Sequence, residues 1–293
     1  MVAVVTTTAG CFPGWSRGGP PEAVSIQREA GLDRLVTGQQ DWVSWLAEPL
    51  RRQPAVSRVP AVETRGDDRP GYVRTGAFQS TGILCPELKD RTDQFQVVIP
   101  GPYTLSTMLD DPRARDAGET VADITEWLRK EIDDCPAHRT ALILEPALVK
   151  QPPSSDIIEM LPEQLDRLVT PLNDPVVYPW GGTVTPTAYA YLMDANLHAI
   201  GYDIIADSAG AIELIAEFGS PDGVALGCLD AIAGIGVSAP IIIERLETVR
   251  SRSRMADVDH LYVLPNRPLA TLPVGTIQPL LDELGAVDRE LPA

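Results

Sequence analysis

The fold is decided by residues 142–148, which read Leu-Ile-Leu-Glu-Pro-Ala-Leu. This apolar run is too short for a buried helix and is typical of a strand that is buried on both faces. Because a residue before proline favours extended geometry, we expect Glu145 at the carboxyl end of the strand. Sites of parallel α/β barrels are built at that end. The stretch therefore indicates a parallel α/β protein and makes Glu145 a candidate site residue.

Similar apolar runs recur along the chain, and each ends in polar, Gly-rich or Pro-rich residues. They lie at 2–5, 35–36, 95–99, 176–178, 202–206, 224–229 and 261–264. Helical patterns alternate with them, at 21–30, 119–132, 156–168, 185–194, 211–218, 240–250 and 274–284. Alternation of this kind predicts a parallel sheet, and about eight such units make a (β/α)8 TIM barrel. A doubly wound open sheet is the alternative, although no G-x-G-x-x-G follows the first run.

One segment interrupts this alternation. Residues 51–94 are rich in Arg, Pro, Gly and Thr, and Tyr72-Val73-Arg74-Thr75 alternates like a hairpin strand. We expect a single domain over residues 1–293 with an irregular or hairpin excursion at about 51–94. A two-stranded flap over the site and a partly disordered segment are both compatible with this composition.

The charge balance excludes several partners. The chain has a net charge of −17, and lysine occurs only at positions 89, 130 and 150. Nucleic acid or an anionic membrane would meet too little positive charge. Scarce lysine beside excess acid favours a solvated surface adapted to high salt, as in halophiles, over a docking face for a basic partner. Without an apolar run of about 18 residues or a charged leader, the expected location is the cytoplasm.

Cysteines and histidines show no local metal motif. The four cysteines form no C-x-x-C pair, and the three histidines, at 138, 198 and 260, lie far apart in sequence. In a cytosolic chain these cysteines are not expected to form disulfides. Structural or surface roles are therefore favoured for all of them.

Five motifs occur in the order and spacing of a known family. They are TTTAGCFP at 6–13, LVTGQQ at 35–40, PGPYTL at 100–105, LEPAL at 144–148 and GCLD at 227–230. They resemble the TTVGSFP, TDGEQ, GPYTL, DEPAL and GVVD motifs of archaeal cobalamin-independent methionine synthases. The resemblance extends over nearly the whole chain. It implies a TIM barrel of the superfamily that also contains uroporphyrinogen decarboxylase.

The resemblance implies a zinc site that this sequence does not preserve. Family members bind zinc to activate the homocysteine thiol, and the methyl group comes from a folate or a corrinoid. Their ligands are an H-x-C on the fifth strand, a Glu on the sixth and a Cys on the eighth. The corresponding tips here offer Tyr178-Pro179-Trp180, Ala206 or Asp207, and Arg267 in place of the Cys. A guanidinium cannot ligate zinc and would repel it, so no catalytic zinc is expected.

The positions that would hold the amino group of homocysteine are altered as well. Leu144 replaces the Asp of DEPAL, and Gln39 replaces the Glu of TDGEQ. Two carboxylates that could pair with an ammonium group are therefore absent. Glu145 and Asp230 remain as the catalytic candidates. Each could act as a general base or ligand-binding carboxylate, or could hold the loops of the rim together.

Binding candidates lie at the other strand tips. Arg267 could bind a carboxylate or phosphate, or could pair with Glu145 or Asp230. Tyr178 and Trp180 could stack on a flat ligand or fill the vacated pocket. The remaining candidates are polar or aromatic tip residues, namely Gln39, Gln40, Trp42, Tyr103, Thr104, Asp207 and Asn266.

Three functions fit these observations. The first is a zinc-less folate-binding or partner barrel in methionine biosynthesis, working with a separate zinc-bearing methionine synthase subunit. The second is a stand-alone, zinc-independent methyltransferase of one-carbon metabolism that uses a methylated folate or corrinoid. The third, a decarboxylase-like lyase, requires several convergent arginines, and only Arg267 lies clearly at a strand tip.

Overall fold

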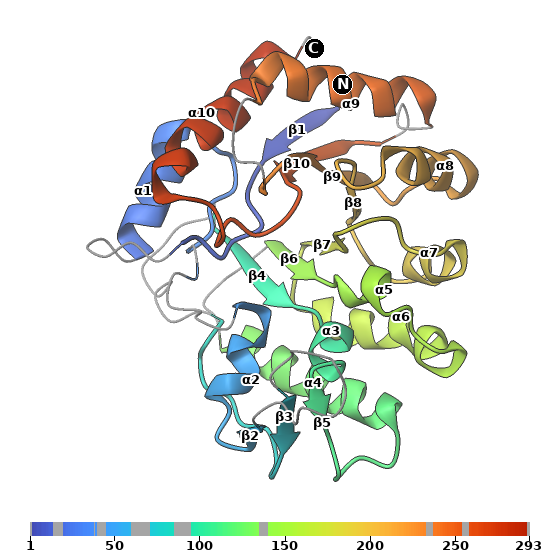
Figure 1. The fold of residues 1–293 in the computed structure, drawn as a ribbon. Helices are drawn as coiled ribbons and strands as arrows, with labels where there is room; N and C mark the ends of the chain where they lie inside the picture. Colours follow the sequence, from blue (N-terminus) through green and yellow to red (C-terminus); the bar gives the residue numbers. More distant parts are fainter. Residues whose placement is uncertain are drawn as a thin grey trace.

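The structure is a computed structural model of the chain (Figure 1). It describes residues 2–13, 20–37, 39, 45–59, 71–84, 95–134, 140–232, 237–253 and 258–291. Everything below concerns these residues. The predicted site residues Gln40 and Trp42 lie outside them.

A seven-stranded parallel sheet forms the centre of the molecule, in the order β1-β10-β9-β8-β7-β6-β4. The strands are β1 (Ala3–Thr6), β4 (Gln96–Pro100), β6 (Thr140–Leu144), β7 (Asp174–Tyr178), β8 (Ala199–Asp203), β9 (Gly223–Leu229) and β10 (His260–Pro265). Nearly every residue of β4 to β9 is buried, which explains why these strands are continuous apolar runs. Figure 1 shows the sheet curling with helices around it.

Residues 34–35 lie between the two edge strands of this sheet. The N–H of Arg34 donates to the carbonyl of Thr6 in β1 at 3.1 Å, and the N–H of Gln96 in β4 donates to the carbonyl of Leu35 at 2.9 Å. Leu35 also forms an isolated parallel bridge with Phe95. The strand expected at 35–36 is thus reduced to a bridge, and the observed architecture is a curled seven-stranded sheet.

Helices separate the strands. The longer ones are α1 (Pro20–Ala30), α4 (Ala117–Asp133), α6 (Ser155–Val169), α7 (Pro186–Met193), α8 (Ser208–Phe218), α9 (Ala239–Arg252) and α10 (Val274–Glu290). Short turns of helix are η1 (Trp45–Ala47), α2 (Glu48–Arg52), α3 (Pro102–Ser106) and α5 (Ala147–Lys150). Helix α4 shows the local logic: Asp116 accepts from the N–H of Glu119 as its N-cap, and Val121, Ile124 and Leu128 are fully buried.

The segment at 51–94 contains β2 (Val56–Val59) and β3 (Gly71–Arg74), which pair antiparallel. Strand β3 also pairs with β5 (Leu109–Asp110), so the excursion forms a small separate sheet. Arg74 anchors it through ion pairs to Asp111 at 2.8 Å and to Asp123 of α4 at 2.6 Å. Phe78 stacks on Trp127 of α4 with ring centroids 5.0 Å apart. The described part of the excursion is therefore fixed to α4.

The sixth predicted strand differs from the structure by three residues. The apolar run predicted a strand at 202–206, whereas β8 is Ala199–Asp203. The carboxylate of Asp203 accepts from the N–H of Ala206 at 3.0 Å, which turns the chain and ends the strand. The acid at the end of this strand is therefore Asp203 and not Asp207.

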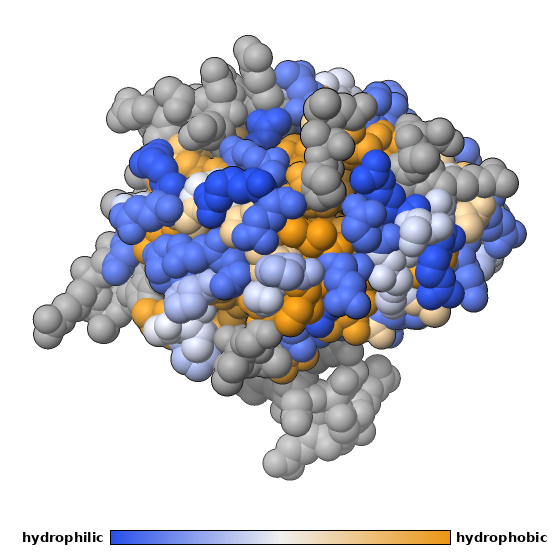
Figure 2. Space-filling view, turned by 90° about the horizontal axis from the view of Figure 1, so that it is seen from above, coloured by the Kyte–Doolittle hydropathy of each residue, from blue (hydrophilic) through white to orange (hydrophobic). Residues whose placement is uncertain are grey.

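Polar side chains are interspersed with apolar ones on the face seen in Figure 2. In the described part of the chain, the exposed large apolar side chains are Ile232, Ile241 and Val274. No helix described by the structure is long and apolar enough to cross a membrane.

Candidate functional site

Glu145 clamps two strands together at the carboxyl end of the sheet. It directly follows β6 and is completely buried. Its carboxylate accepts from the N–H of Tyr103 at 2.9 Å and from the N–H of Thr104 at 2.8 Å. The hydroxyl of Thr104 donates to it as well, at 2.5 Å, and accepts from the N–H of Ala147. We call this group, Glu145 with Tyr103 and Thr104, the Glu145 clamp.

The clamp requires glycine at the start of α3. A Cβ on Gly101 would lie 1.9 Å from Cδ of Glu145. Burial raises the pKa of Glu145 to about 7, against the lowering effect of its hydrogen bonds to Thr104 and Tyr103. All three donors belong to α3, which begins two residues after the end of β4. In this structure Glu145 therefore joins the end of β6 to the start of α3.

A second polar group links the tips of β7, β8 and β10, and we call it the tip network. The hydroxyl of Tyr178 donates to the carbonyl of Asn266 at 2.9 Å. The amide of Asn266 donates to Asp203 at 3.2 Å. Asp203 also accepts from the N–H of Gly181 at 3.0 Å. Tyr178, Asp203 and Asn266 are each at most 1% exposed.

Two glycines make room for the phenol ring of Tyr178. A Cβ on Gly201 in β8 would lie 2.1 Å from the ring, and one on Gly227 in β9 would lie 1.8 Å from its hydroxyl oxygen. The ring therefore lies across the paired strands β8 and β9, in the space that the missing side chains of Gly201 and Gly227 leave. Trp180 is also buried, with its ring centroid 6.5 Å from that of Tyr178.

Arg267 places a positive charge beside the tip network. Its guanidinium lowers the pKa of Tyr178, although burial, the largest effect, raises that pKa well above its usual value. Nε of Arg267 is buried and has no hydrogen-bond partner among the described residues. No ion pair joins Arg267 to Glu145 or Asp230, each of which the structure describes. A buried guanidinium nitrogen without an acceptor is a binding group for an anion.

Two loops of this rim, the one after β1 and the one after Thr37, each contain a non-glycine residue with a strained, positive φ. Cys11 and Gln39 both have positive φ, 47° and 43°. The side-chain oxygen of Gln39 accepts from the N–H of Cys11 at 3.0 Å. A Cβ on Gly10 would lie 2.4 Å from that oxygen, so glycine allows Gln39 to dock. Non-glycine residues in this region of φ concentrate at functional sites, which supports the choice of this end of the sheet.

The remaining candidates have local roles. Asp207 is the N-cap of α8 and accepts from the N–H of Gly210 at 2.9 Å. Asp230 accepts from the N–H of Ile232 at 2.8 Å in the turn after β9. Sequence reasoning missed Asp203. The available signal was the carboxylate after Tyr202 inside an apolar run, where a buried acid needs partners.

The described residues contain no group of three or more His, Cys, Asp or Glu side chains that could hold a metal ion. The tips that correspond to the zinc-ligand positions present a phenol, an indole and a guanidinium, from Tyr178, Trp180 and Arg267. Asp203 is the one carboxylate of the tip network, and three hydrogen bonds already engage it. These side chains do not fit a zinc ion.

Two solved structures with a similar fold are described as a methionine synthase and a putative methionine synthase. The chain resembles a B12-independent methionine synthase from Shewanella sp. W3-18-1 in complex with selenomethionine, with a TM-score of 0.75 and 17% identity over 99% of this chain and 97% of the other. It also resembles a putative vitamin-B12-independent methionine synthase from Listeria monocytogenes, with a TM-score of 0.65 and 15% identity over 92% and 85% of the two chains. No protein-family model and no curated protein sequence matches the chain. The likeness establishes the fold.

Proposed function

We propose that this chain is a methionine synthase-like barrel of methionine and one-carbon metabolism that binds an anionic methyl carrier. Arg267 supports this reading most directly, because its buried Nε has no hydrogen-bond partner among the described residues and lies beside the tip network. A methylated folate, whose glutamate tail bears carboxylates, matches a guanidinium in charge and geometry. In this proposal the zinc chemistry on homocysteine belongs to a separate zinc-bearing methionine synthase subunit.

The hydrogen bonds already made by the carboxylates of Glu145 and Asp203 favour a ligand-binding function over a catalytic one. Glu145 accepts three hydrogen bonds within the rim, and Asp203 accepts from two backbone N–H groups and from Asn266. Asp230, the other catalytic candidate, accepts from the backbone of its own turn. In contrast to these carboxylates, Arg267 keeps a buried nitrogen with no hydrogen-bond partner among the described residues.

The proposal includes closure of the sheet into a (β/α)8 barrel. Residues 34–35 bond to β1 on one side and to β4 on the other, which supports their role as the eighth strand. Closure places the tip of that strand, with Gln39, beside the loop after β1. The anion site and the strained loops then share one rim.

One observation favours the alternative of a stand-alone, zinc-independent methyltransferase. The pKa of Glu145 is raised to about 7, which suits a general base near neutral pH. In this alternative the isolated chain transfers a methyl group from a folate or corrinoid without a partner. The three donors around Glu145 would have to release it during the reaction.

Purification under native salt, followed by an activity assay, distinguishes these functions. If the first proposal holds, the tagged chain retains a zinc-bearing methionine synthase chain in near-equal amount, and the isolated chain transfers no methyl group to homocysteine. Methyl transfer by the isolated chain that Glu145→Gln abolishes would establish the alternative. A chain that purifies alone and binds neither a methylated folate nor a methylated corrinoid would refute both.

A further inference from the structure

Two histidines that are 62 positions apart meet at the amino end of the sheet. His198 directly precedes β8, and His260 is the first residue of β10. Their ring centroids lie 4.7 Å apart, with the ring planes inclined by 60°. This cluster lies at the opposite end of the strands from Glu145 and Arg267.

Glycine between the two strands permits this contact. Strand β9 runs between β8 and β10, and its first residue, Gly223, pairs with Ala199 and with His260. Strands two places apart in a sheet are separated by roughly 10 Å, so an intervening side chain would normally stand between their neighbours. A Cβ on Gly223 would lie 3.3 Å from Cβ of His260. The missing side chain leaves space in which the rings approach each other.

Each ring has one nitrogen that is buried and without a hydrogen-bond partner among the described residues. These atoms are Nε2 of His198 and Nδ1 of His260. Burial, the largest effect, lowers the pKa of His198, and the nearby His260 lowers it further. Tyr262 contacts both rings through its aromatic face or edge and offers neither of these nitrogens a hydrogen bond. A neutral imidazole with an unused nitrogen is a ligand for a metal ion.

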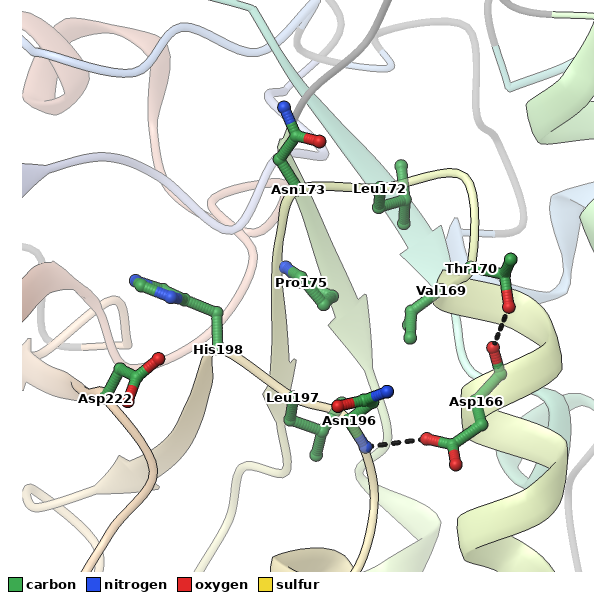
Figure 3. A pocket seen from close by; sticks show the side chains of 10 residues that line it. All are labelled: Asp166, Val169, Thr170, Leu172, Asn173, Pro175, Asn196, Leu197, His198 and Asp222. Atoms are coloured by element: carbon green, nitrogen blue, oxygen red, sulfur yellow. Dashed lines mark hydrogen bonds between the residues drawn. The ribbon is translucent and has the colours of Figure 1, made fainter.

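A polar pocket of about 300 Å³ adjoins this pair, and His198 and Asp222 both line it (Figure 3). Of the nearby carboxylates, Asp166 accepts from the N–H of Asn196 at 2.6 Å and Asp174 pairs with Arg34 at 3.4 Å. The carboxylate of Asp222 makes no ion pair with any residue that the structure describes. Figure 3 shows His198 and Asp222 on the same side of the pocket. The pocket therefore places beside His198 a carboxylate that makes no ion pair with a described residue.

We propose that His198 and His260 bind one divalent transition-metal ion of the Ni²⁺ or Zn²⁺ type at the amino end of the sheet. Two imidazoles that share such an ion, at about 2.1 Å per bond, hold their ring centres roughly 5 Å apart. The observed 4.7 Å separation and the inclined planes fit this arrangement. Asp222 lines the same pocket as His198 and adds negative charge near the ion without serving as a ligand, and solvent from the pocket would fill the remaining coordination positions. Two imidazoles suit borderline metals and disfavour Mg²⁺ and Ca²⁺.

Calorimetric titration of the full chain with Ni²⁺ and, separately, Zn²⁺ tests this site. We expect one equivalent to bind at pH 7.5, with affinity reduced by at least about tenfold in either His198→Gln or His260→Gln. Asp222→Asn should reduce it by less. His138→Gln is the matched control, since His138 is the remaining histidine of the chain. Lowering the pH to 5.5 should weaken binding because protons compete for both rings.

The unfolding temperature of each variant without metal shows whether it is folded. Wild-type chain that binds neither ion would overturn the proposal. So would stoichiometric binding that persists in a folded His198→Gln, His260→Gln double variant. Mg²⁺ should produce no heat above dilution, and equal binding of Mg²⁺ and Ni²⁺ would contradict the assignment to imidazole nitrogen.

Discussion

The Glu145 clamp and the tip network with Arg267 lie on the same rim and differ in how completely their polar groups are used. Glu145 is fully buried and receives three donors from Tyr103 and Thr104. Arg267 has a buried nitrogen with no described acceptor. The carboxylate of the Glu145 clamp is satisfied by hydrogen bonds within the protein, whereas the guanidinium beside the tip network has a buried nitrogen without an acceptor among the described residues.

The difference separates motifs that preserve the fold from positions that set the function. The residues that match the family motifs, Gly101 and Glu145, hold β4 and β6 together. Two residues replace zinc ligands in the resemblance. Tyr178 fills the space over Gly201 and Gly227, and Arg267 has a buried Nε with no partner among the described residues. The motifs that this chain shares with the family therefore indicate its fold. A change of function should be sought at the positions where the chain differs from the family.

The largest expected effect comes from Gly101→Ala, which places a methyl group against the carboxyl of Glu145 at 1.9 Å. We expect it to lower the free energy of unfolding by about 3 kcal/mol or more, as in severe overpacking. Urea denaturation measures the change. Gly275→Ala is the matched control, because a Cβ there meets nothing within 4 Å. Equal effects of the two substitutions would mean that the clamp is not tightly packed.

The next effect concerns the pH dependence of stability. The folded-state pKa of Glu145, about 7, lies above the ordinary value of 4.5. The folded state therefore holds the proton more tightly, and this contribution is fully present below about pH 4.5 and lost as the pH rises through about 7. Glu145→Gln stays neutral and lacks this loss. The difference in unfolding free energy between the two proteins should change by up to about 3 kcal/mol between pH 4.5 and pH 8. Parallel pH profiles would contradict the raised pKa.

Asp203→Ala should open the tip network. It leaves the N–H of Gly181, the N–H of Ala206 and the amide of Asn266 without their acceptor. The amide of Asn266 is buried, and a buried donor without a partner costs about 1–3 kcal/mol. The N–H groups of Gly181 and Ala206 belong to exposed residues and add less, so we expect a total loss of about 2–3 kcal/mol in unfolding free energy. Asp207→Ala, which removes only the N-cap of α8, should cost about 1 kcal/mol. A smaller effect at Asp203 than at Asp207 would argue against the network.

Tyr178→Phe gives the smallest effect. It removes the hydrogen bond from the phenol to the carbonyl of Asn266 and keeps the ring that fills the space over Gly201 and Gly227. We expect a loss of about 1 kcal/mol in thermal or urea denaturation. A loss as large as that caused by Asp203→Ala would mean that the hydroxyl, and not the ring, is the main contribution of Tyr178.

The sequence predicted the strands well because burial on both faces leaves a continuous apolar run. One exception is the run at 35–36, which forms only an isolated bridge. Another is β8, whose apolar run continues through Ile204 and Ile205 although the strand ends at Asp203. The turn depends on a side-chain hydrogen bond from Ala206 to Asp203, which an apolar pattern does not show.

The candidate site was less accessible to sequence reasoning because its contacts are distant in the chain. The side chain of Asp203 accepts a hydrogen bond from Asn266, which lies 63 positions later in the sequence. The burial of Tyr178 depends on Gly201 and Gly227, which belong to two other strands. Arg267 was identified at the correct tip, but its expected partners, Glu145 and Asp230, are engaged elsewhere.

The central claim is that Arg267 binds an anionic methyl carrier, and a fluorescence or calorimetric titration with a methylated tetrahydrofolate tests it most directly. Wild type should bind, and Arg267→Gln should bind at least about tenfold more weakly because a charged hydrogen bond is lost. Arg115→Gln is the matched control, because the side chain of Arg115 is 84% exposed and the residue lies two positions before the start of α4. Unchanged affinity in a folded Arg267→Gln variant would contradict the account.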